Sequence, residues 1–531
     1  MASKPDFRGA QEASAPPKRA RSETSRYEES AALRRTLKIV VGAAAQLAFP
    51  DRVLIGGQTV GEAYMYGFDQ GEASQDDVDA IAAGIRSLIS SDARLVRVTR
   101  TFAEATKYFE AAGMRHSLAL LRSRVQDQVQ LLALQGSCLG DNEVLRLPLV
   151  PTGELALPSS LPPVRLSRHR HGFVVIYATD PSYVVSPTLL ASTTDHKRWA
   201  TNMGVNSAGE LNSLNPVGSR ELTDFILQAE FRQESILAQL STEVHVRCQA
   251  GGSRHVGVIC IAGPTSSGKT TFATKLAMYL RNKGMVGMPL TVDHYYLPLD
   301  QQPRYQARKL RSDVDYDAIE SMDAKLVNEH INALLAGEEI MTPVYNMKTG
   351  YRDEPGHPFK LPQGGVLIIE GIHALNPDFL RSVPAGRVFK VYISPLSTLQ
   401  LDESTAIKTT DHRLLRRMSR DYLFRGHSAS RTLSMWPNVR RGEHTWIFPH
   451  MDAVDFVVNS AMEYEMGVLK NLVEPLLMAV APDDPQYEKA QSLLALLGLF
   501  NPIPPTTNGV IRVPAISVLR EFIGEGAFDC H

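Results

Sequence analysis

The sequence predicts two folded parts: an α+β part over residues 37–245 and an α/β part with a parallel, doubly wound sheet over residues 246–531. Two observations predict this division. From residue 256 onward, short apolar strands alternate with Gly-rich turns and helices, at spacings typical of parallel crossovers. Before residue 245, helical and strand patterns mix without a repeat and without a chemical signature. We therefore expect the chemistry to lie in the second part.

The composition is that of an ordinary folded protein. Of the 531 residues, 44% are hydrophobic and 21% are charged, which excludes wholesale disorder and disulfide scaffolds. Lys and Arg number 56 against 57 for Asp and Glu, so no global charge attracts nucleic acid or anionic lipid. The four cysteines form no C-x-x-C pair, which fits a reducing compartment. The early apolar stretch 37–49 is too short to span a bilayer, so we expect no membrane partner.

Residues 1–36 are predicted to be a disordered tail, since Pro, Ser, Ala and both signs of charge are mixed there. Within it, Lys18-Arg19-Ala20-Arg21 has the character of a nuclear import signal, although basic clusters in flexible tails are usually only solvated charge. We expect a cytoplasmic protein, and the cluster leaves the nucleus open as an alternative.

In the first part, the apolar spacing predicts helices over residues 77–90 and 223–240 and a strand over 172–177. Thr101-x-x-Glu104 has the spacing of a capping box, which predicts a further helix start.

In the second part, five short runs rich in Val and Ile predict the strands of a buried parallel sheet. They are residues 256–262, 289–292, 366–369, 388–393 and 455–458. Helices are predicted over 270–283 and 324–336, the second with Asp323 able to cap its start and Gly337 its end.

The most specific motif follows the first of these strands. Residues 263–270 fit G-x-x-x-x-G-K-[ST] without a substitution, between an apolar strand and an amphipathic helix. The glycines let backbone N–H groups converge on phosphate oxygens, and the helix dipole favours the same negative charge. Lys269 would contact the β and γ phosphates of ATP, and Thr270 would place its hydroxyl on Mg²⁺. The alternative is a plain Gly-rich turn that starts a helix. The predicted nucleotide-binding residues are Gly263, Pro264, Thr265, Ser266, Ser267, Gly268, Lys269, Thr270 and Thr271.

Residues further along indicate a kinase among nucleotide-binding proteins. No N-K-x-D run for guanine follows Lys269, and no second nucleotide-binding half is present. A small-molecule kinase needs an acid near the γ phosphate and cations over the transferred group. Asp293 ends the second predicted strand, although it also suits a helix cap or turn. Glu370 ends the third and can reach the Mg²⁺ shell, so Thr270, Asp293 and Glu370 are the predicted metal residues.

The cations come from a cluster of eight arginines with a single acid, Asp421, among them. They are Arg413, Arg416, Arg417, Arg420, Arg425, Arg431, Arg440 and Arg441. The first four share a helix face, so we expect them to fold over ATP as a lid. A nucleic-acid patch is the alternative, but it would usually show more interleaved aromatic residues.

These residues resemble the uridine kinase and phosphoribulokinase superfamily over about residues 255–480. Closer still is the likeness to chimaeric proteins that join a threonyl-tRNA-synthetase-like module to a uridine-kinase-like domain. The shared motifs are the phosphate loop, Asp293 with Tyr296, Tyr316-Asp317 before Asp323, Pro343-Val344-Tyr345, Ile369-Glu370-Gly371, and Arg416-Arg417-Met418-Ser419-Arg420-Asp421 with Arg425-Gly426. The runs 436–443 and 517–524 look like the chimaeric subgroup specifically.

The resemblance implies a role for each matched residue. Asp293 is the implied general base on a nucleoside 5′-hydroxyl, and Asp317 and Tyr345 are implied to hold the ribose or base. Arg417, Arg420 and Arg425 are implied to contact phosphates or substrate, and with Lys269 and Asp293 they form the predicted catalytic set. Tyr296, Tyr316 and Arg352 complete the predicted substrate residues.

Two positions depart from the uridine kinase pattern. Gly350 stands where those enzymes carry a base-recognising His, and His427 replaces their second lid arginine. Because loss of a buried polar partner can change discrimination between analogues by orders of magnitude, pyrimidine specificity does not carry over.

Residues 45–235 are similar to the second additional domain of threonyl-tRNA synthetases, which edits mischarged tRNA through a His and Cys cluster. The matching stretch here, residues 56–61, has neither histidine, so editing is not expected. His169 and His171 form a metal-ligating pair in principle, but no third ligand is evident and a solvated loop is the favoured interpretation. Binding or regulation is the predicted role of this part.

The sequence thus predicts an ATP- and Mg²⁺-dependent kinase acting on a hydroxyl of a nucleoside-like small molecule. The alternatives are a kinase for another polyol or sugar phosphate, and a nucleotide-regulated binding protein that has lost catalysis, with RNA as one candidate partner. A nucleic-acid partner and assembly into a homo-oligomer stay open.

Overall fold

The computed structural model describes residues 34, 36–140, 142–149, 155–157, 164–177, 180–214, 219–249, 255–308, 315–381, 383–451, 453–507 and 510–528. Nearly all of the predicted tail, with its Lys18–Arg21 cluster, lies outside the described residues. None of the helices within the described ranges has the length and apolar character needed to cross a membrane.

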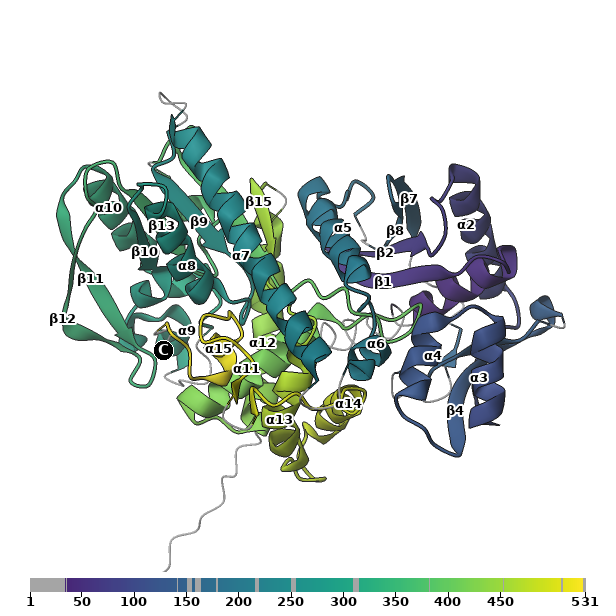
Figure 1. The fold of residues 1–531 in the computed structure, drawn as a ribbon. Coiled ribbons are helices and arrows are strands. Elements are labelled where there is room, and N and C mark those ends of the chain that lie inside the picture. Colours follow the sequence, from purple (N-terminus) through teal and green to yellow (C-terminus); the bar gives the residue numbers. More distant parts are fainter. Residues whose placement is uncertain are drawn as a thin grey trace, which may run out of the picture.

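A five-stranded parallel sheet forms the centre of the second part, in the order β10-β13-β9-β14-β15 (Figure 1). The strands are β9 (Val258–Ala262), β10 (Gly287–Thr291), β13 (Val366–Glu370), β14 (Val388–Ser394) and β15 (Phe456–Asn459). The five predicted strands are therefore confirmed. Because the strands are parallel, their carboxyl ends meet at one edge, and β9 lies between β13 and β14 with the phosphate loop at that edge.

Helices cover both faces of this sheet because its buried side chains alternate. Ile259 and Ile261 of β9 pack with α7 (Arg220–Gln249) and α8 (Lys269–Arg281) on one face. Val258 and Cys260 pack with α10 (Ala324–Leu335) on the other. The Asp323 side chain caps α10 by accepting from the Leu326 N–H, as predicted. The doubly wound sheet that the apolar strands predicted is confirmed.

Several elements of the second part go beyond the prediction. An antiparallel hairpin of β11 (Glu339–Asn346) and β12 (Tyr351–Lys360) projects from the sheet (Figure 1). The remaining helices are α9 (Pro303–Arg308), α11 (Thr409–Arg425), α12 (Ala429–Gly442), α13 (Glu465–Met478), α14 (Tyr487–Leu497) and α15 (Arg520–Ile523). A short antiparallel pair, β16 (Thr506–Thr507) with β17 (Val510–Ile511), precedes α15.

The first part contains two four-stranded antiparallel sheets. One has the order β1-β2-β8-β7 and the other β5-β4-β3-β6. The strands are β1 (Leu54–Val60), β2 (Ala63–Phe68), β3 (Arg94–Thr101), β4 (Gln128–Gln135), β5 (Val144–Arg146), β6 (Leu155–Ala156), β7 (Arg165–His169) and β8 (Gly172–Ile176). The helices are α2 (Gln75–Ser90), α3 (Phe102–Ala111), α4 (Arg115–Arg122), α5 (Pro187–Asn202) and α6 (Ala208–Ser213). The predicted helix over 77–90, the strand over 172–177 and the Thr101–Glu104 capping box are confirmed.

The two parts share elements and core. Helix α7 passes the predicted boundary near residue 245 and runs alongside the parallel sheet (Figure 1). Leu237, Leu240 and Val244 of this helix pack against the sheet of the second part. One apolar cluster joins Phe109 and Phe225 of the first part to Leu414 and Phe522 of the second. The loop after β14, residues 395–408, reaches back to the first part, where the Gly56 N–H donates to the Glu403 carbonyl at 2.8 Å.

Candidate active site

The phosphate loop joins the end of β9 to the start of α8. Gly268, at its end, has φ +88°, a left-handed conformation that favours glycine. A Cβ atom on Gly263 would lie 2.0 Å from the Ile393 carbonyl oxygen, so the loop and β14 approach each other too closely for any side chain there. Lys269 is buried, and its Nζ donates to the carbonyl oxygens of Gly263 at 3.1 Å and Pro264 at 3.4 Å. The lysine thus lies over its own loop.

Oxygen donors gather beside the loop at the carboxyl edge of the sheet. The Glu370 carboxylate accepts from the Thr270 hydroxyl at 3.2 Å and from the Thr291 hydroxyl at 2.6 Å. Thr291 lies directly opposite Glu370 in the β10–β13 pairing. Asp293 follows, and its Oδ1 atom is buried with no hydrogen-bond partner among the described residues. A hydroxyl, a buried carboxylate and an orphaned carboxylate oxygen are hard ligands of the kind that Mg²⁺ prefers, so the residues fit that ion.

The protonation of Glu370 reflects this crowding. Burial, and then the charge of Asp293, raise the pKa of Glu370 to about 7, against the opposing effect of Lys269. A buried carboxylate close to a second acid is costly to ionise unless a cation joins it. A cation bound here would therefore favour the ionised form of Glu370.

The predicted acceptor residues form an aromatic wall next to Asp293. The Tyr296 ring lies 5.5 Å from that of Tyr316 and 5.3 Å from that of Tyr345, centroid to centroid. The Tyr296 hydroxyl donates to the Tyr316 carbonyl at 2.7 Å. Asp293 and Asp317 both act on the pKa of Tyr296, which burial raises well above its usual value. The structure therefore brings together four of the predicted acceptor residues and the predicted base.

Asp317 is desolvated in this pocket. Desolvation raises its pKa to about 7 although the charge of Arg417 opposes the rise. Gly442, at the end of α12, presses against it, since a Cβ atom on Gly442 would lie 2.3 Å from the Asp317 Cβ. A carboxyl group held this way is able to accept hydrogen bonds from a polyol.

Arg352 and Gly350 lie on the β11–β12 hairpin. The Arg352 guanidinium donates to the Asp323 carboxylate at 3.2 Å and to the Tyr296 carbonyl at 3.2 Å, so it braces the acceptor wall from behind. Gly350 occupies the hairpin turn with φ +84°, and its carbonyl accepts from the Leu299 N–H at 2.8 Å. The position that departs from the uridine kinase pattern is thus part of a tight turn.

The lid cations converge on one buried carboxylate, Asp421. Arg417 and Arg425 donate to it at 3.1 and 3.2 Å, and Arg420 does so at 3.4 Å. His427, the second departure, also faces it, with 3.8 Å between Nδ1 and Oδ2. Burial opposes the ionisation of Asp421, but the charges of Arg420, Arg417, Arg425 and His427 hold its pKa below the usual value. Asp421 therefore fixes the cations in one group near the acceptor pocket.

Arg413 and Arg416 do not belong to this lid, and the prediction that all four arginines line ATP is wrong for them. Both are fully buried, Arg413 in an ion pair with Glu443 and Arg416 in an ion pair with Glu465. Arg413 also donates to the Thr265 carbonyl at 3.1 Å, so it supports the phosphate loop from beneath. The helix face that they share with Arg417 turns toward the protein interior because two buried acids receive it, Glu443 directly after α12 and Glu465 at the start of α13.

Sequence reasoning missed Thr291, Glu443, Glu465 and Glu521 as parts of the site. Glu521 accepts from the Thr271 N–H at 3.2 Å and from its hydroxyl at 2.9 Å. For Glu521, the run 517–524 could have indicated a role, because it was recognised as a motif but had no function assigned to it. The others carry no local signal, because their partners lie far away in the sequence.

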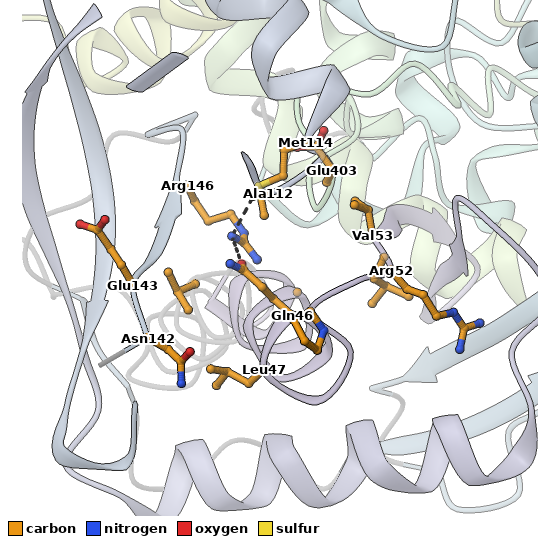
Figure 2. Close-up of a pocket in the computed structure, with 14 residues that line it drawn as sticks. Gln46, Leu47, Arg52, Val53, Ala112, Met114, Asn142, Glu143, Arg146 and Glu403 are labelled. Carbon is orange, nitrogen blue, oxygen red and sulfur yellow. Dashed lines mark hydrogen bonds between the residues drawn. The ribbon is translucent and has the colours of Figure 1, made fainter. Parts of the chain in front are cut away.

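A cavity of ≈ 110 Å³ lies in the first part (Figure 2), and no residue of the phosphate loop lines it. The buried Arg146 points into it and donates to Gln46 at 2.8 Å, with Met114 beside it. Glu403, from the loop after β14, also lines it, and its carboxylate accepts from the His116 N–H at 2.7 Å at the start of α4. The cavity therefore borders the contact between the two parts.

The predicted histidine pair lies at the β7–β8 turn. The His169 Nδ1 atom accepts from the His171 N–H at 3.3 Å. Within the described residues, no group of three or more His, Cys, Asp or Glu side chains is arranged to hold a metal ion.

The sheet order, the phosphate loop and the carboxyl-edge acids define a P-loop kinase fold. A family model described as the phosphoribulokinase / uridine kinase family matches residues 258–466. A uridine kinase from Bacillus cereus is 32% identical over 208 residues, covering 39% of this chain and 87% of the relative. A uridine kinase from Halobacterium salinarum is 26% identical over 242 residues, covering 44% of this chain and 95% of the relative. The chain belongs to the phosphoribulokinase / uridine kinase family through this region.

Among solved structures, D-glycerate 3-kinase from Cryptococcus neoformans is 15% identical, with a TM-score of 0.22, and the match covers 49% of this chain and 86% of that one. The family membership supports a phosphotransferase activity for the second part.

Proposed function

We propose that the protein is an ATP- and Mg²⁺-dependent kinase that phosphorylates a hydroxyl group of a nucleoside or a related small polyol. The observation that carries the proposal is the position of Asp293. Asp293 has a buried oxygen without a partner among the described residues, and its charge acts both on Glu370 beside the phosphate loop and on Tyr296 in the acceptor wall. A base in this position is able to take the proton of an acceptor hydroxyl as the hydroxyl attacks.

Each group of residues in the site has a separate proposed role. The 263–268 loop and Lys269 bind the phosphates of ATP, and Thr270 and Glu370 hold Mg²⁺, which neutralises charge on the transferred group. Tyr296, Tyr316, Asp317 and Tyr345 orient the acceptor against Asp293. Arg417, Arg420 and Arg425 supply positive charge on the lid side, and the effect of Asp293 on the pKa of Arg425 supports their closeness. Arg352 holds the acceptor wall in place.

Uridine is one member of the proposed acceptor class, and other nucleosides and small polyols belong to it equally. The two relatives described above are uridine kinases, but Gly350 and His427 replace side chains of the uridine kinase pattern. A site built to hydrogen-bond a base rejects the wrong one strongly, so the change of two such residues alters the acceptor that fits.

The test is ADP release by the purified full chain with Mg-ATP and a panel of acceptors: ribonucleosides, deoxyribonucleosides, pantothenate and ribulose 5-phosphate. Acceptor-dependent release is expected, and Asp293→Asn is expected to lower turnover by roughly a hundredfold or more while ATP still binds. Lys269→Ala is expected to weaken both binding and turnover.

Full turnover in Asp293→Asn would remove Asp293 as the base. ATP binding without turnover for any acceptor, together with salt-dependent RNA binding, would favour a nucleotide-regulated binding protein instead.

For the first part, we propose binding or regulation in place of tRNA editing. The stretch that would carry an editing motif is occupied by contacts to the kinase part, since the Gln58 amide donates to the Thr398 carbonyl at 3.3 Å and Gly56 bonds to Glu403. Incubation with mischarged threonine tRNA is expected to give no deacylation above the buffer rate, and faster deacylation would contradict the proposal.

A further inference from the structure

The C-terminal run 517–524 lies against the phosphate loop. Val518 packs on Gly268 so closely that a Cβ atom on that glycine would lie 2.4 Å from Val518 Cγ2. The Lys275 ammonium, on the first helix after the loop, donates to the Ile516 carbonyl at 3.0 Å. The last described turn of the chain, α15, therefore borders the site where nucleotide phosphates are proposed to bind (Figure 1).

Glu521 makes the central contact of this run. Its Oε2 atom accepts from the Thr271 N–H at 3.2 Å and from the Thr271 hydroxyl at 2.9 Å, and the residue is only 8% exposed. Thr271 is the third residue of α8, so its N–H is one of the amides that a helix leaves without an internal partner. In a phosphate loop these amides are offered to the phosphates of the nucleotide. The carboxylate therefore occupies a donor pair that suits a phosphate oxygen.

The same run is also bound to the lid helix α11. The Ser419 hydroxyl donates to the Phe522 carbonyl at 2.8 Å, and the Arg416 guanidinium lies 4.9 Å from the centroid of the Phe522 ring. Phe522 is fully buried. The position of Glu521 is thus fixed from two sides, by the start of α8 and by α11.

We propose that Glu521 is a built-in competitor of the nucleotide, whose carboxylate must leave Thr271 before a phosphate group binds there. The inference rests on the nucleotide binding proposed above. Two anions cannot share the Thr271 donors, and a carboxylate left next to a bound phosphate would repel it. While Glu521 is bonded to Thr271, the protein accordingly has a low affinity for ATP. Release of residues 517–524 from α8 and α11 raises this affinity.

The test is titration calorimetry of the full chain with Mg-ATP, comparing the wild type with Glu521→Gln and Glu521→Ala. Both variants are expected to bind ATP about tenfold or more tightly than the wild type, since each removes a negative charge next to the bound phosphate. The matched control is Glu525→Gln, which removes an 82% exposed carboxylate from the same segment and should leave the affinity unchanged.

Equal or weaker ATP binding by Glu521→Gln, with measurable binding by the wild type, would overturn this inference alone. Absence of ATP binding in the folded wild type and in both variants would overturn the proposed function together with it.

A second measurement uses the wild type alone, in case the variants fold poorly. Hydrogen exchange followed by mass spectrometry is expected to show faster exchange over residues 517–524 when Mg-ATP is added, because the run loses its contact with Thr271. Slower or unchanged exchange of this segment under saturating ATP would contradict the proposal.

Discussion

Asp317 and Asp293 lie in one pocket but have different environments. Asp317 is pressed against Gly442 and loses solvent, whereas Asp293 keeps one oxygen without a partner among the described residues. The sequence predicted Asp293 from the strand that it ends, whereas Asp317 was implied by the resemblance to uridine kinases. It could not predict the raised pKa of Asp317, which depends on α12 folding back over it from more than a hundred residues away.

The pKa of Asp317 leads to a prediction for acceptor binding. A carboxyl group with a pKa of about 7 is protonated below that pH and ionised above it. Because the ionised form accepts stronger hydrogen bonds from hydroxyl groups, KM for the acceptor is expected to fall as pH rises through about 7. Steady-state KM measured across this range for the acceptor found in the panel checks the prediction.

Asp317→Asn is expected to abolish this pH dependence, while Asp300→Asn, which changes an exposed carboxyl, should keep the wild-type profile.

The raised pKa of Asp317 also predicts how the stability of the protein depends on pH. Since folding raises the pKa of Asp317 above its unfolded value, its burial costs stability that is fully expressed above about pH 7. Asp317→Asn should therefore be more stable than the wild type above that pH, and a loss of stability there would contradict the assignment.

Helix α11 carries arginines of two kinds. Arg416 is buried against Glu465, and although burial opposes it, the charges of Arg416 and His412 lower the pKa of Glu465 to about 2. Arg425 is 40% exposed and binds Asp421 near the acceptor pocket. The spacing of the sequence predicted the helix and its cationic character, but not which arginines turn inward. That depends on Glu443 and Glu465, which arrive from later helices.

Two substitutions in this helix are expected to affect different properties, one the stability and the other the turnover. Arg416→Met should destabilise the protein by about 3–5 kcal/mol, because it leaves Glu465 buried without its main partner. Arg425→Ala should lower turnover with a stability change of less than about 1 kcal/mol. Denaturant unfolding and steady-state kinetics of both variants separate the two roles. An Arg416→Met protein that is stable but has no turnover would show that Arg416 acts at the phosphate site and not as a structural residue.

The β11–β12 hairpin and the C-terminal helices are among the elements that the sequence did not predict. Strand β12 exposes most of its side chains, so it lacks the apolar alternation that marks a half-buried strand. Helices α13 and α14 pack within a large shared cluster, and their apolar residues give no hint of the partner. The parallel strands were predictable because burial on both faces makes each a continuous apolar run.

The whole molecule is held together by contacts that cross the predicted boundary. Glu403, from the loop after β14, caps the start of α4 by accepting from the His116 and Ser117 N–H groups at 2.7 and 3.2 Å. The Tyr464 hydroxyl donates to the Glu230 carboxylate, and the Gln233 amide donates to the Asn459 carbonyl at 2.9 Å. Long-range pairings of this kind are invisible in a single sequence. The boundary near residue 245 stays a prediction.

Glu403→Ala is expected to destabilise the full chain by about 1–3 kcal/mol, because it leaves buried amide and hydroxyl donors at the start of α4 without an acceptor. Glu338→Ala, at an exposed turn, should change stability by less than about 0.5 kcal/mol. The free energy of unfolding in urea for both variants checks the prediction. Equal stability of the two variants would show that the Glu403 contacts contribute little to holding the first and second parts together.

Strand β14 touches the phosphate loop near its end, where Ile393 faces Gly263, and the chain then runs directly into the 395–408 loop that the first part holds. The two parts are consequently constrained to evolve together. A foreign module exchanged for the first part would leave Gln400 without the Asn206 and Ala208 backbone groups that it bonds at 2.8 Å each, and Glu403 without its helix. Recombination between the two parts would thus give a functional protein only when changes in this loop are inherited together with matching changes in the first part.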